Sequence, residues 1–470
     1  MIELMLNDEV VRADVPAGTV LLDFLRSARG LKGTKEGCRE GDCGACTVLV
    51  GEAVEGGVRY RAVASCLLPV GELAGRHVVT IEGLDTGGLS PVQEALVEEG
   101  ATQCGFCTPG IVVALTGFLL ADQPLDLEHG LTAIDGNICR CTGYVSIRRA
   151  VERLAGSVDD PGVPAERRAA ALAGSVLPAY FAGVAERLRA MDGGAGGVTE
   201  ASAGATVVAG GTDLFVQRPG QLLKQPLRFL GHRPELRRVR IDGREVTLGA
   251  MVTVEDLLRH PVLGERVPGW GRALELMGST LIRNRATVAG NIVNASPIGD
   301  LSILMLALGA RLELEGPDGR RELELERFHL GYKEYDLAPG ELITAVRFEL
   351  PAEGAGFNFE KVSRRERLDI ASVNTAFLVE AEDGVVSRAL LAAGGVAPVP
   401  LLLAGSSAWL TGRPVAPETL RGLLERVEEE IAPIDDVRGS AEYKRLLLRR
   451  LVIAHFVACF PDLDAGELLP

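Results

Sequence analysis

Eight of the nine cysteines lie within the first 141 residues, where they form two groups of four. The first group has the spacing C-x4-C-x2-C and, after nineteen intervening residues, a fourth cysteine; its members are Cys38, Cys43, Cys46 and Cys66. This spacing is typical of plant-type [2Fe–2S] sites. The second group joins a C-x2-C pair to a C-x-C pair across 31 residues, and its members are Cys104, Cys107, Cys139 and Cys141. Two four-thiolate sites in one chain predict electron transfer.

Zinc is the alternative ligand for such cysteines. Zinc ribbons prefer paired C-x2-C knuckles, which the gap of four residues between Cys38 and Cys43 does not match. Glycines alternate with the thiols in the loop Gly37–Cys46. A backbone that wraps a cluster needs this freedom, because its N–H groups must approach the sulfur atoms closely. The loop therefore favours an iron–sulfur cluster. The ninth cysteine, Cys459, lies in an apolar helical pattern and is assigned to the core.

Length, charge and hydropathy limit the classes of protein. A chain of 470 residues predicts about three domains of ~150 residues. The 49 basic and 64 acidic side chains give a net charge of −15, which argues against a nucleic-acid or acidic-membrane partner. The apolar runs, such as Ile111–Leu120 and Leu301–Leu308, are shorter than the roughly 18 residues of a membrane span. The first residues lack a basic secretion signal, so we expect a cytoplasmic protein whose cysteines bind metal rather than form disulfides.

The elements that must position the two cysteine groups differ in type. Alternating apolar residues over 2–6, a turn at Asn7-Asp8 and a return strand predict a β-hairpin ahead of the first cluster loop. After residue 86 helical signals replace the strands. Ser90 followed by Pro91 is typical of a helix start, and Pro109 opens another helix. We expect four short helices here, with both cysteine pairs near helix N-termini, whose partial positive charge favours thiolates.

Two glycine turns follow in the middle of the chain. In Val207–Leu214 an apolar strand runs into Gly-Gly-Thr, whose N–H groups can hold a pyrophosphate; a plain strand-to-helix turn is the alternative. Thr287–Ile292 is a second glycine turn, which we also expect between apolar strands. Asp300 follows it and can accept hydrogen bonds from sugar-like hydroxyls. The stretch Asp192–Gly197 has no G-x-G-x-x-G between a strand and a helix, so it does not predict a dinucleotide site.

Three cysteine motifs carry a family resemblance. CREGDCGACTV, QCGFCTPG and GNICRCTGY resemble the two-cluster iron–sulfur module of the xanthine dehydrogenase family of molybdenum hydroxylases, over residues 1 to about 155. The resemblance implies that electrons pass from molybdenum to the helical cluster, then to the plant-type cluster, then to FAD. It also implies that Gln103 and Cys141 face the molybdopterin cofactor, which a partner holds.

The glycine turns resemble the FAD domain of the same family, which has a vanillyl-alcohol-oxidase-like fold. The FAD contacts that the resemblance implies are Val207, Val208, Ala209, Gly210, Gly211, Thr212, Asp213, Leu214, Thr287, Val288, Ala289, Gly290, Asn291, Asp300 and Lys361. Lys361 is implied near the flavin and the nicotinamide nucleotide; a solvated surface lysine is the alternative. Met277 takes the place of an aromatic side chain that stacks near the flavin in animal relatives.

The resemblance implies an α+β multidomain protein. The expected domains are a β-grasp plant-type [2Fe–2S] domain at 1–85, a helical [2Fe–2S] domain at 86–157, a linker at 158–175, an FAD-binding α/β domain at 176–348 and a C-terminal α+β domain at 349–470.

The molybdenum-binding part of the family is absent from this sequence. The chain therefore resembles the small subunit of the two-subunit bacterial members, which is inactive in hydroxylation without a large molybdopterin subunit. The implied function is electron transfer to NAD during oxidation of hypoxanthine or xanthine to urate, in a heterodimer or a dimer of heterodimers. One alternative is the same role with an N-heterocycle, aldehyde or aromatic thioester as substrate. The other is a stand-alone iron–sulfur flavoprotein carrier.

Overall fold

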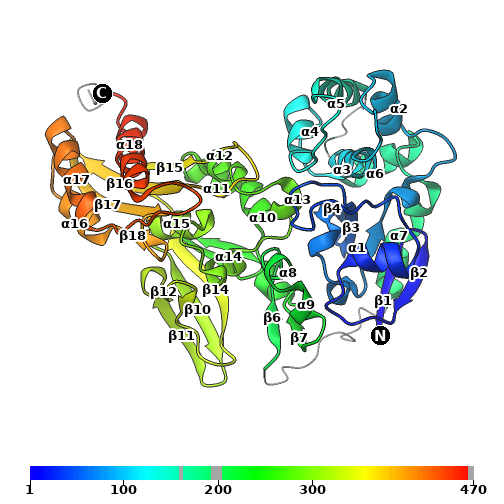
Figure 1. The fold of residues 1–470 in the computed structure, drawn as a ribbon, viewed down its shortest axis with the longest axis horizontal. Coiled ribbons are helices and arrows are strands. Elements are labelled where there is room, and N and C mark those ends of the chain that lie inside the picture. The colour runs from blue at the N-terminus through cyan, green and yellow to red at the C-terminus, as the bar shows by residue number, and fades with distance from the viewer. Residues whose placement is uncertain (158–161, 163, 192–203, 464–470) are drawn as a thin grey trace. The chain divides into compact units, whose positions relative to one another are not determined.

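The computed structural model describes residues 1–157, 162, 164–191 and 204–463. The chain forms two compact units, Met1–His232 with Gly278–Arg285 and Arg233–Met277 with Ala286–Pro470 (Figure 1). Helices and sheets occur in both, so the predicted α+β multidomain class is confirmed. Asp192–Gly197 and part of the predicted linker lie outside the described residues. Among the described helices, none is long and apolar enough to cross a membrane.

The first unit begins with a five-stranded sheet in the order β2-β1-β5-β3-β4. The strands are β1 (Ile2–Leu6), β2 (Glu9–Ala13), β3 (Thr47–Val54), β4 (Gly57–Ala64) and β5 (His77–Val79). Only β1 and β5 run parallel, and β1 and β2 form the predicted hairpin. Helix α1 (Leu21–Asp23) continues into the π-helical turn η1 (Phe24–Ala28), and Leu21, Phe24 and Leu25 share a core with the strands. The first cluster loop connects η1 to β3.

Four helices follow, as predicted: α2 (Pro91–Glu98), α3 (Thr108–Leu120), α4 (Leu127–Ala133) and α5 (Val145–Ser157). Ser90 caps α2 and forms a capping box with Gln93. Residues 110–120 of α3 are all buried, because α3 packs against α2, α4, β3 and β4. In Figure 1 these helices gather beside the sheet of the same unit. The apolar run that the sequence assigned to a buried core is therefore the centre of the helical group.

The remainder of the first unit packs onto this core. Helix α6 (Pro164–Ala173) lies within the predicted linker, and its buried Arg167 donates a hydrogen bond to the Ala121 carbonyl. Strands β6 (Thr206–Val208) and β7 (Leu227–Phe229) form a parallel pair. Phe215 and Phe229 join the core that contains α3. The first glycine turn, which follows β6, thus belongs to the unit that carries the cysteines.

The second unit contains an antiparallel sheet in the order β11-β10-β14-β9-β8. Its strands are β8 (Val239–Asp242), β9 (Glu245–Gly249), β10 (Arg311–Gly316), β11 (Gly319–Glu324) and β14 (Leu342–Glu349). Its core includes residues of α10 (Val254–Leu258), α11 (Pro261–Arg266), α12 (Trp270–Glu275), α14 (Val288–Asn294) and α15 (Asp300–Ala307). The expectation that strands surround the second glycine turn was wrong, because residues Val288–Asn294 form helix α14. Thr287 caps α14, and Val288, Ala289 and Ile292 have helical spacing and are buried.

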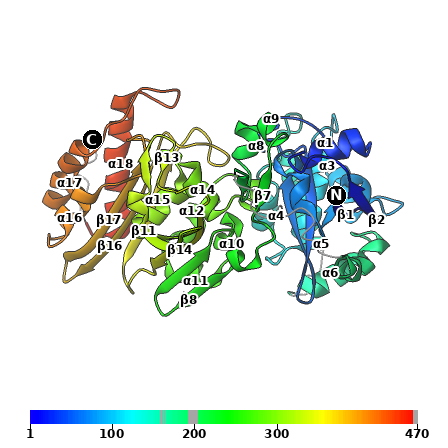
Figure 2. The ribbon, with the colours of Figure 1, turned by 90° about the horizontal axis from the view of Figure 1, so that it is seen from below.

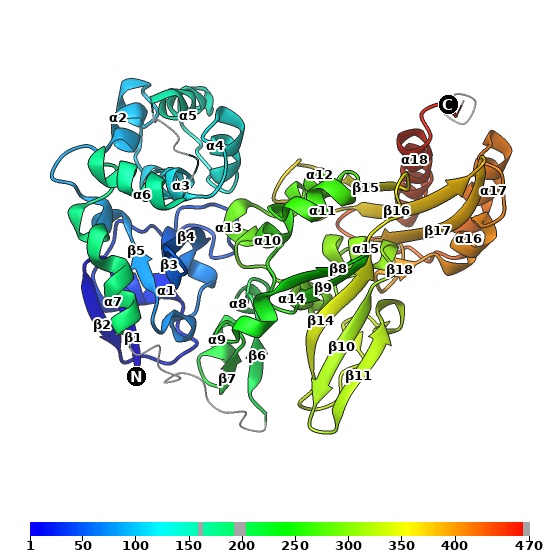
Figure 3. The same ribbon diagram turned by 180° about the vertical axis from the view of Figure 1, so that it is seen from behind.

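The C-terminal part has a four-stranded sheet of β15 (Gly356–Val362), β16 (Val373–Glu382), β17 (Val385–Gly394) and β18 (Leu401–Leu402). Alternate residues of β16 enter two cores. Ala376 and Leu378 pack with α15, whereas Phe377 and Val379 pack with α16 (Ala404–Leu410), α17 (Pro417–Glu429) and α18 (Ala441–Cys459). Figures 2 and 3 show these last helices beside the sheet. The sheet is therefore covered by helices on both faces.

Candidate functional site

The first four cysteines meet as two pairs. Cys38 exchanges a hydrogen bond with Cys43, which lowers the pKa of Cys38 to about 5. Cys46 exchanges one with Cys66, which lowers the pKa of Cys46. Thiols that meet two by two suit a centre of two iron ions, each bound by two sulfurs.

The first cluster loop has the room that such a centre needs. A Cβ atom on Gly37 would lie 2.7 Å from Cys43 Sγ, so glycine leaves the space that a side chain would fill. Gly44 has a φ of +64°, which favours glycine. The N–H of Cys38 lies 3.4 Å from Cys43 Sγ, and that of Glu40 lies 3.3 Å from Cys38 Sγ. These N–H groups stabilise thiolates and tune the potential of a cluster. The loop therefore fits a [2Fe–2S] cluster.

The second group of cysteines repeats the pairing. The sulfur atoms of Cys104 and Cys141 are 3.5 Å apart, and Cys107 hydrogen-bonds with Cys139. The Phe106 N–H and then the Cys141 thiol lower the pKa of Cys104. Burial and then Cys139 raise the pKa of Cys107 to about 12. This donor set again has the chemistry of a two-iron centre.

One backbone hydrogen bond joins the two cysteine groups. The N–H of Ile138 donates to the carbonyl oxygen of Cys43 at 3.0 Å. Cys43 belongs to the first group, and Ile138 directly precedes Cys139 of the second. The amide of Asn137 also donates to the Gly44 carbonyl at 3.0 Å. A short path of covalent bonds and one hydrogen bond therefore connects a sulfur of each predicted cluster.

The second cysteine group opens to the surface. Cys104 and Cys141 are exposed, and so is Gln103. Large apolar side chains close to these cysteines in the chain are also exposed, at 45–63%: Phe106, Ile138, Tyr144 and Val145. Exposed apolar side chains that flank a site in the sequence suit an interaction surface. We call these four residues the apolar rim.

The turn after β6 fits a diphosphate. Gly210 and Gly211 are buried, and within the described part of the chain their backbone N–H groups donate no hydrogen bond. A buried N–H without a partner costs about 1–3 kcal/mol, so phosphate oxygens would satisfy both. Arg285 fixes the turn: its Nη2 donates to the Gly210 carbonyl, and Glu72 Oε2, 3.0 Å away, balances its charge. These residues match what the pyrophosphate of FAD requires.

The second predicted flavin segment lies in the other compact unit. The backbone N–H groups at the start of α14 are occupied, because Gly290 donates to Thr287 Oγ1 at 3.1 Å and Val288 donates to the Val252 carbonyl at 3.0 Å. The side chain of Asn291 accepts from the Ser302 N–H at 3.2 Å. This segment therefore offers packing and side-chain contacts rather than free N–H groups.

Lys361 and Asp300 form a buried ion pair in the second unit. Lys361 Nζ lies 2.7 Å from Asp300 Oδ2, and the side chains are only 2% and 15% exposed. Lys361 also donates to the Leu276 carbonyl at 2.8 Å, directly before Met277 in the chain. The amide of Asn374 donates to the other carboxylate oxygen of Asp300. The alternative of a solvated surface lysine is therefore wrong.

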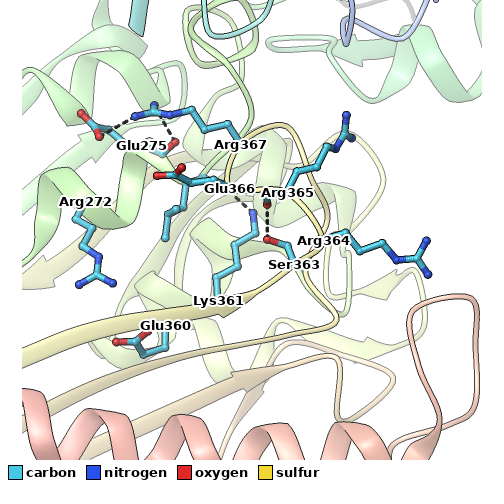
Figure 4. Close-up of a pocket in the computed structure, with 10 residues that line it drawn as sticks. Arg272, Glu275, Glu360, Lys361, Ser363, Arg364, Arg365, Glu366 and Arg367 are labelled. Carbon is cyan, nitrogen blue, oxygen red and sulfur yellow. Dashed lines mark hydrogen bonds and ion pairs between the residues drawn. The ribbon is translucent and has the colours of Figure 1, made fainter. Parts of the chain in front are cut away.

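A cavity of about 330 Å³ lies beside Lys361 (Figure 4). Its basic lining residues are Arg272, Lys361, Arg364, Arg365 and Arg367, and its acidic ones are Glu275, Glu360 and Glu366. Arg367 is paired with Glu275 at 3.2 Å, while Arg364 and Arg365 are exposed. The basic excess makes this cavity suitable for an anionic ligand such as part of a nucleotide.

Sequence reasoning missed several residues of these sites. Asn374 gave no signal, because it is a buried polar residue in an apolar strand. Arg285 stands close to the second glycine turn, but its contact with Gly210 joins segments 75 residues apart. The sequence does contain a signal for the cavity. Several arginines follow Lys361, and arginines often bind phosphate groups, so this run predicts an anion-binding site.

Four protein-family models match the chain. A 2Fe-2S iron-sulfur cluster binding domain matches residues 4–70, and a [2Fe-2S] binding domain matches residues 80–152. An FAD binding domain in molybdopterin dehydrogenase matches residues 194–352. A CO dehydrogenase flavoprotein C-terminal domain matches residues 358–457.

Curated relatives include xanthine dehydrogenases. Xanthine dehydrogenase 1 of Arabidopsis thaliana is 29% identical over 95% of the chain, and the Drosophila subobscura enzyme is 30% identical over 96%. Xanthine dehydrogenase/oxidase of Rattus norvegicus is 28% identical over 98% of the chain. The chain spans only 39% of the length of each of these relatives.

Chains of solved structures are also similar to this chain. A carbon monoxide dehydrogenase from Hydrogenophaga pseudoflava that lacks the Mo-pyranopterin moiety of its cofactor is similar, with 30% identity and a TM-score of 0.52. The match covers 55% of this chain and 90% of that one. Quinoline 2-oxidoreductase from Pseudomonas putida 86 shares 25% identity, with a TM-score of 0.50 over 54% of this chain and 89% of that one. The chain therefore belongs to the molybdenum hydroxylase family, as a member with its two iron–sulfur domains and its FAD-binding part.

Proposed function

We propose that this chain is the electron-transfer subunit of a molybdenum hydroxylase. It passes electrons one at a time from molybdopterin in a partner, by way of two [2Fe–2S] clusters, to FAD and then to NAD. The observation that carries this proposal is the hydrogen bond from Ile138 to Cys43, which links the two cysteine groups. Redox centres that exchange electrons must be close, and two unrelated structural metal sites have no need of such a link.

The proposed cluster ligands are the eight cysteines that meet in pairs. The first cluster takes Cys38, Cys43, Cys46 and Cys66, and the second takes Cys104, Cys107, Cys139 and Cys141. Each pair already contains a sulfur whose pKa is lowered by its neighbours, which favours the thiolate that iron needs. The domain boundaries expected from the sequence remain part of this proposal.

Both glycine segments are proposed as FAD contacts, each within its own unit. In the first unit, Gly210 and Gly211 supply N–H groups for the pyrophosphate. In the second unit, Thr287–Asn291 and Asp300 remain the predicted contacts to the rest of FAD. FAD would supply the step from one-electron to two-electron chemistry, as a hydride donor to NAD. Lys361 holds Asp300 in place, and the basic cavity beside it supports NAD as the anionic acceptor.

The partner is proposed to be a large molybdopterin-binding subunit in the cytoplasm, in a heterodimer or a dimer of heterodimers. The exposed Cys104 and Cys141, with the apolar rim, support a docking surface at the second cluster, where Gln103 and Cys141 would face the cofactor. Xanthine is the proposed substrate, because the curated relatives are xanthine dehydrogenases over nearly the whole chain. The carbon monoxide and quinoline enzymes favour a second candidate, the same role with another substrate.

The test is the anaerobic visible spectrum of the complex purified from its own host, before and after xanthine is added. We expect the flavin and iron–sulfur absorbance to bleach. Absence of bleaching with xanthine, while dithionite reduces every centre and molybdenum is present, would contradict xanthine as the substrate. Failure of dithionite to reduce two clusters and a flavin would contradict the electron-transfer role itself.

A further inference from the structure

A short piece of the FAD-domain sequence lies with the iron–sulfur domains. Helix α13 (Thr280–Arg283) falls within the residues matched by the FAD binding domain, 194–352. The segment Gly278–Arg285, which contains α13, nevertheless belongs to the first compact unit. It is the only part of residues 233–463 that does so. In the chain it connects Met277 to the second predicted flavin segment.

Both iron–sulfur domains hold this segment. Asp135, in the turn after α4 of the helical domain, accepts from the Thr280 N–H at 2.8 Å and pairs with Arg283 at 3.1 Å. The Arg283 and Asp135 side chains are 1% and 5% exposed. From the other side, the Asn284 amide donates to the Ala62 carbonyl of β4 at 2.9 Å. Contacts this well buried fix the helix against both domains.

Ile282 is the residue that these contacts bring to the first cluster loop. A Cβ atom on Gly41 would lie 2.6 Å from Ile282 Cδ1 and 2.8 Å from Leu67 Cδ1, so both side chains pack against Gly41. Gly41 is buried and has a φ of +82°. Gly41 lies two residues before Cys43, and Leu67 directly follows Cys66, so this cover stands beside ligands of the first cluster.

We propose that Ile282 sets the reduction potential of the first, plant-type cluster by keeping water away from Gly41 and from the loop that carries Cys38 and Cys43. The inference rests on the proposed function, because it assumes that Cys38, Cys43, Cys46 and Cys66 bind a cluster. Ile282 is a positioning residue: it touches the loop rather than the iron. The FAD-domain sequence would thereby tune the centre that delivers electrons to FAD.

The direction of the effect follows from charge. One-electron reduction adds a negative charge to the cluster, and water stabilises the more charged form. Solvent exposure and hydrogen bonds to sulfur are among the factors that set such potentials. A smaller side chain at position 282 admits water, so it favours the reduced cluster and raises the potential. We expect the second cluster to keep its potential, because Gly41 lies in the loop of the first cluster.

The experiment is an EPR-monitored redox titration of the full chain with its cofactors bound. The variants are Ile282→Ala, Ile282→Leu as the volume-conserving control, and Ile241→Ala as the same change in the second unit. Signals are assigned to each cluster with Cys43→Ser and Cys107→Ser. At a fixed potential, Ile282→Ala should raise the reduced-to-oxidised ratio of the first cluster about tenfold, which is about 59 mV for one electron. Both controls should leave it unchanged.

A second readout is the rate at which each cluster bleaches in air. Ile282→Ala should bleach faster at the first cluster alone. Two normal signals with an unchanged first potential in Ile282→Ala would overturn the inference and leave the proposed function intact. Equal shifts of both potentials would also overturn it, because they indicate general loosening. Absence of either signal in the unmodified chain would overturn the proposed function together with the inference.

Discussion

At the scale of single residues, the cysteines show what a sequence can and cannot predict. Their spacing predicts two ligand groups, because spacing reflects loops that wrap a cluster. It does not say which thiols pair, since Cys66 and Cys46 meet only when β4 lies beside β3. Both groups consist of two pairs of thiols, although the first group lies beside a sheet and the second lies among helices.

Serine substitutions test the ligand assignment. Cys43→Ser should remove the EPR signal of the first cluster, and Cys107→Ser that of the second, because a hydroxyl is a poor replacement for a thiolate on iron. The flavin should stay bound in both variants. Cys459→Ser is the matched control, since the ninth cysteine packs against the C-terminal core. Two intact signals in either cluster variant would contradict the assignment.

The ion pair of Lys361 and Asp300 makes a prediction about stability. Removing one partner of a buried pair leaves the other charge uncompensated, which costs about 3–5 kcal/mol. We expect Lys361→Met to lose on the order of 3 kcal/mol of unfolding free energy. Urea unfolding followed by tryptophan fluorescence measures it, since Trp270 and Trp409, the two tryptophans, both lie in the second unit.

The double variant Lys361→Met with Asp300→Asn is the control for that measurement. It removes both charges, so it should recover much of the lost stability. Equal stabilities of the single and double variants would show that the pair contributes little beyond its packing.

His455 predicts a dependence of stability on pH. It is fully buried between Thr375 and Asn358, and burial lowers its pKa to about 3. The unfolded chain, with a histidine pKa of about 6.5, therefore binds the proton first as the pH falls. Stability is lost from about pH 6.5 downward, by about 2 kcal/mol between pH 7 and pH 5.

His455→Gln removes this titration and keeps a hydrogen-bonding side chain. Its unfolding free energy should fall by about 2 kcal/mol less than that of the unmodified chain between pH 7 and pH 5. The same tryptophan-detected urea unfolding measures it at both pH values. An identical loss in both proteins would mean that the histidine is already charged in the folded state.

At the scale of elements, local signals predicted most of the first unit. The hairpin β1–β2, the capped start of α2 and the buried run of α3 all follow from patterns within a few residues. The prediction of strands around the second glycine turn was wrong, because the sequence Thr287-Val288-Ala289 is compatible both with the end of a strand and with a capped helix. The docking of α13 on the cluster loop was beyond prediction, because Ile282 and Gly41 are far apart in the sequence.

The first cluster loop gives a prediction at this scale. Gly37→Ala places a methyl group 2.7 Å from Cys43 Sγ, so the loop or the sulfur must move. We expect iron and labile sulfide at the first cluster to fall severalfold, with the second cluster intact. Gly88→Ala is the control, because a Cβ there meets nothing within 4 Å. Full occupancy in Gly37→Ala would contradict the role of this loop as a cradle.

At the scale of the whole molecule, the chain combines a compact iron–sulfur unit with a second unit that carries the buried Lys361 ion pair and the basic cavity. The predicted FAD residues are divided between these units, which sequence reasoning did not anticipate. A division of this kind depends on tertiary packing of Phe215 and Phe229 against the helical core, and no local pattern reports it.

The apolar rim gives a prediction about assembly. Val145→Glu places a charge on a side chain that is 63% exposed, so the isolated chain should fold normally. Binding of the proposed molybdopterin subunit should weaken by about 2 kcal/mol if the rim is buried on association. Copurification with a tagged large subunit measures it. Val10→Glu, at a 46% exposed residue of β2, is the control and should not affect binding.

The most direct measurement is a quantitative EPR spectrum of the full chain, purified without oxygen and reduced completely. Four thiolates for each of two centres predict two distinguishable [2Fe–2S] signals, each integrating to about one spin per chain. Chemical analysis should find the matching iron, labile sulfide and one FAD. A single cluster signal, or zinc in place of iron at either cysteine group, would contradict the proposal that this chain conducts electrons through two clusters.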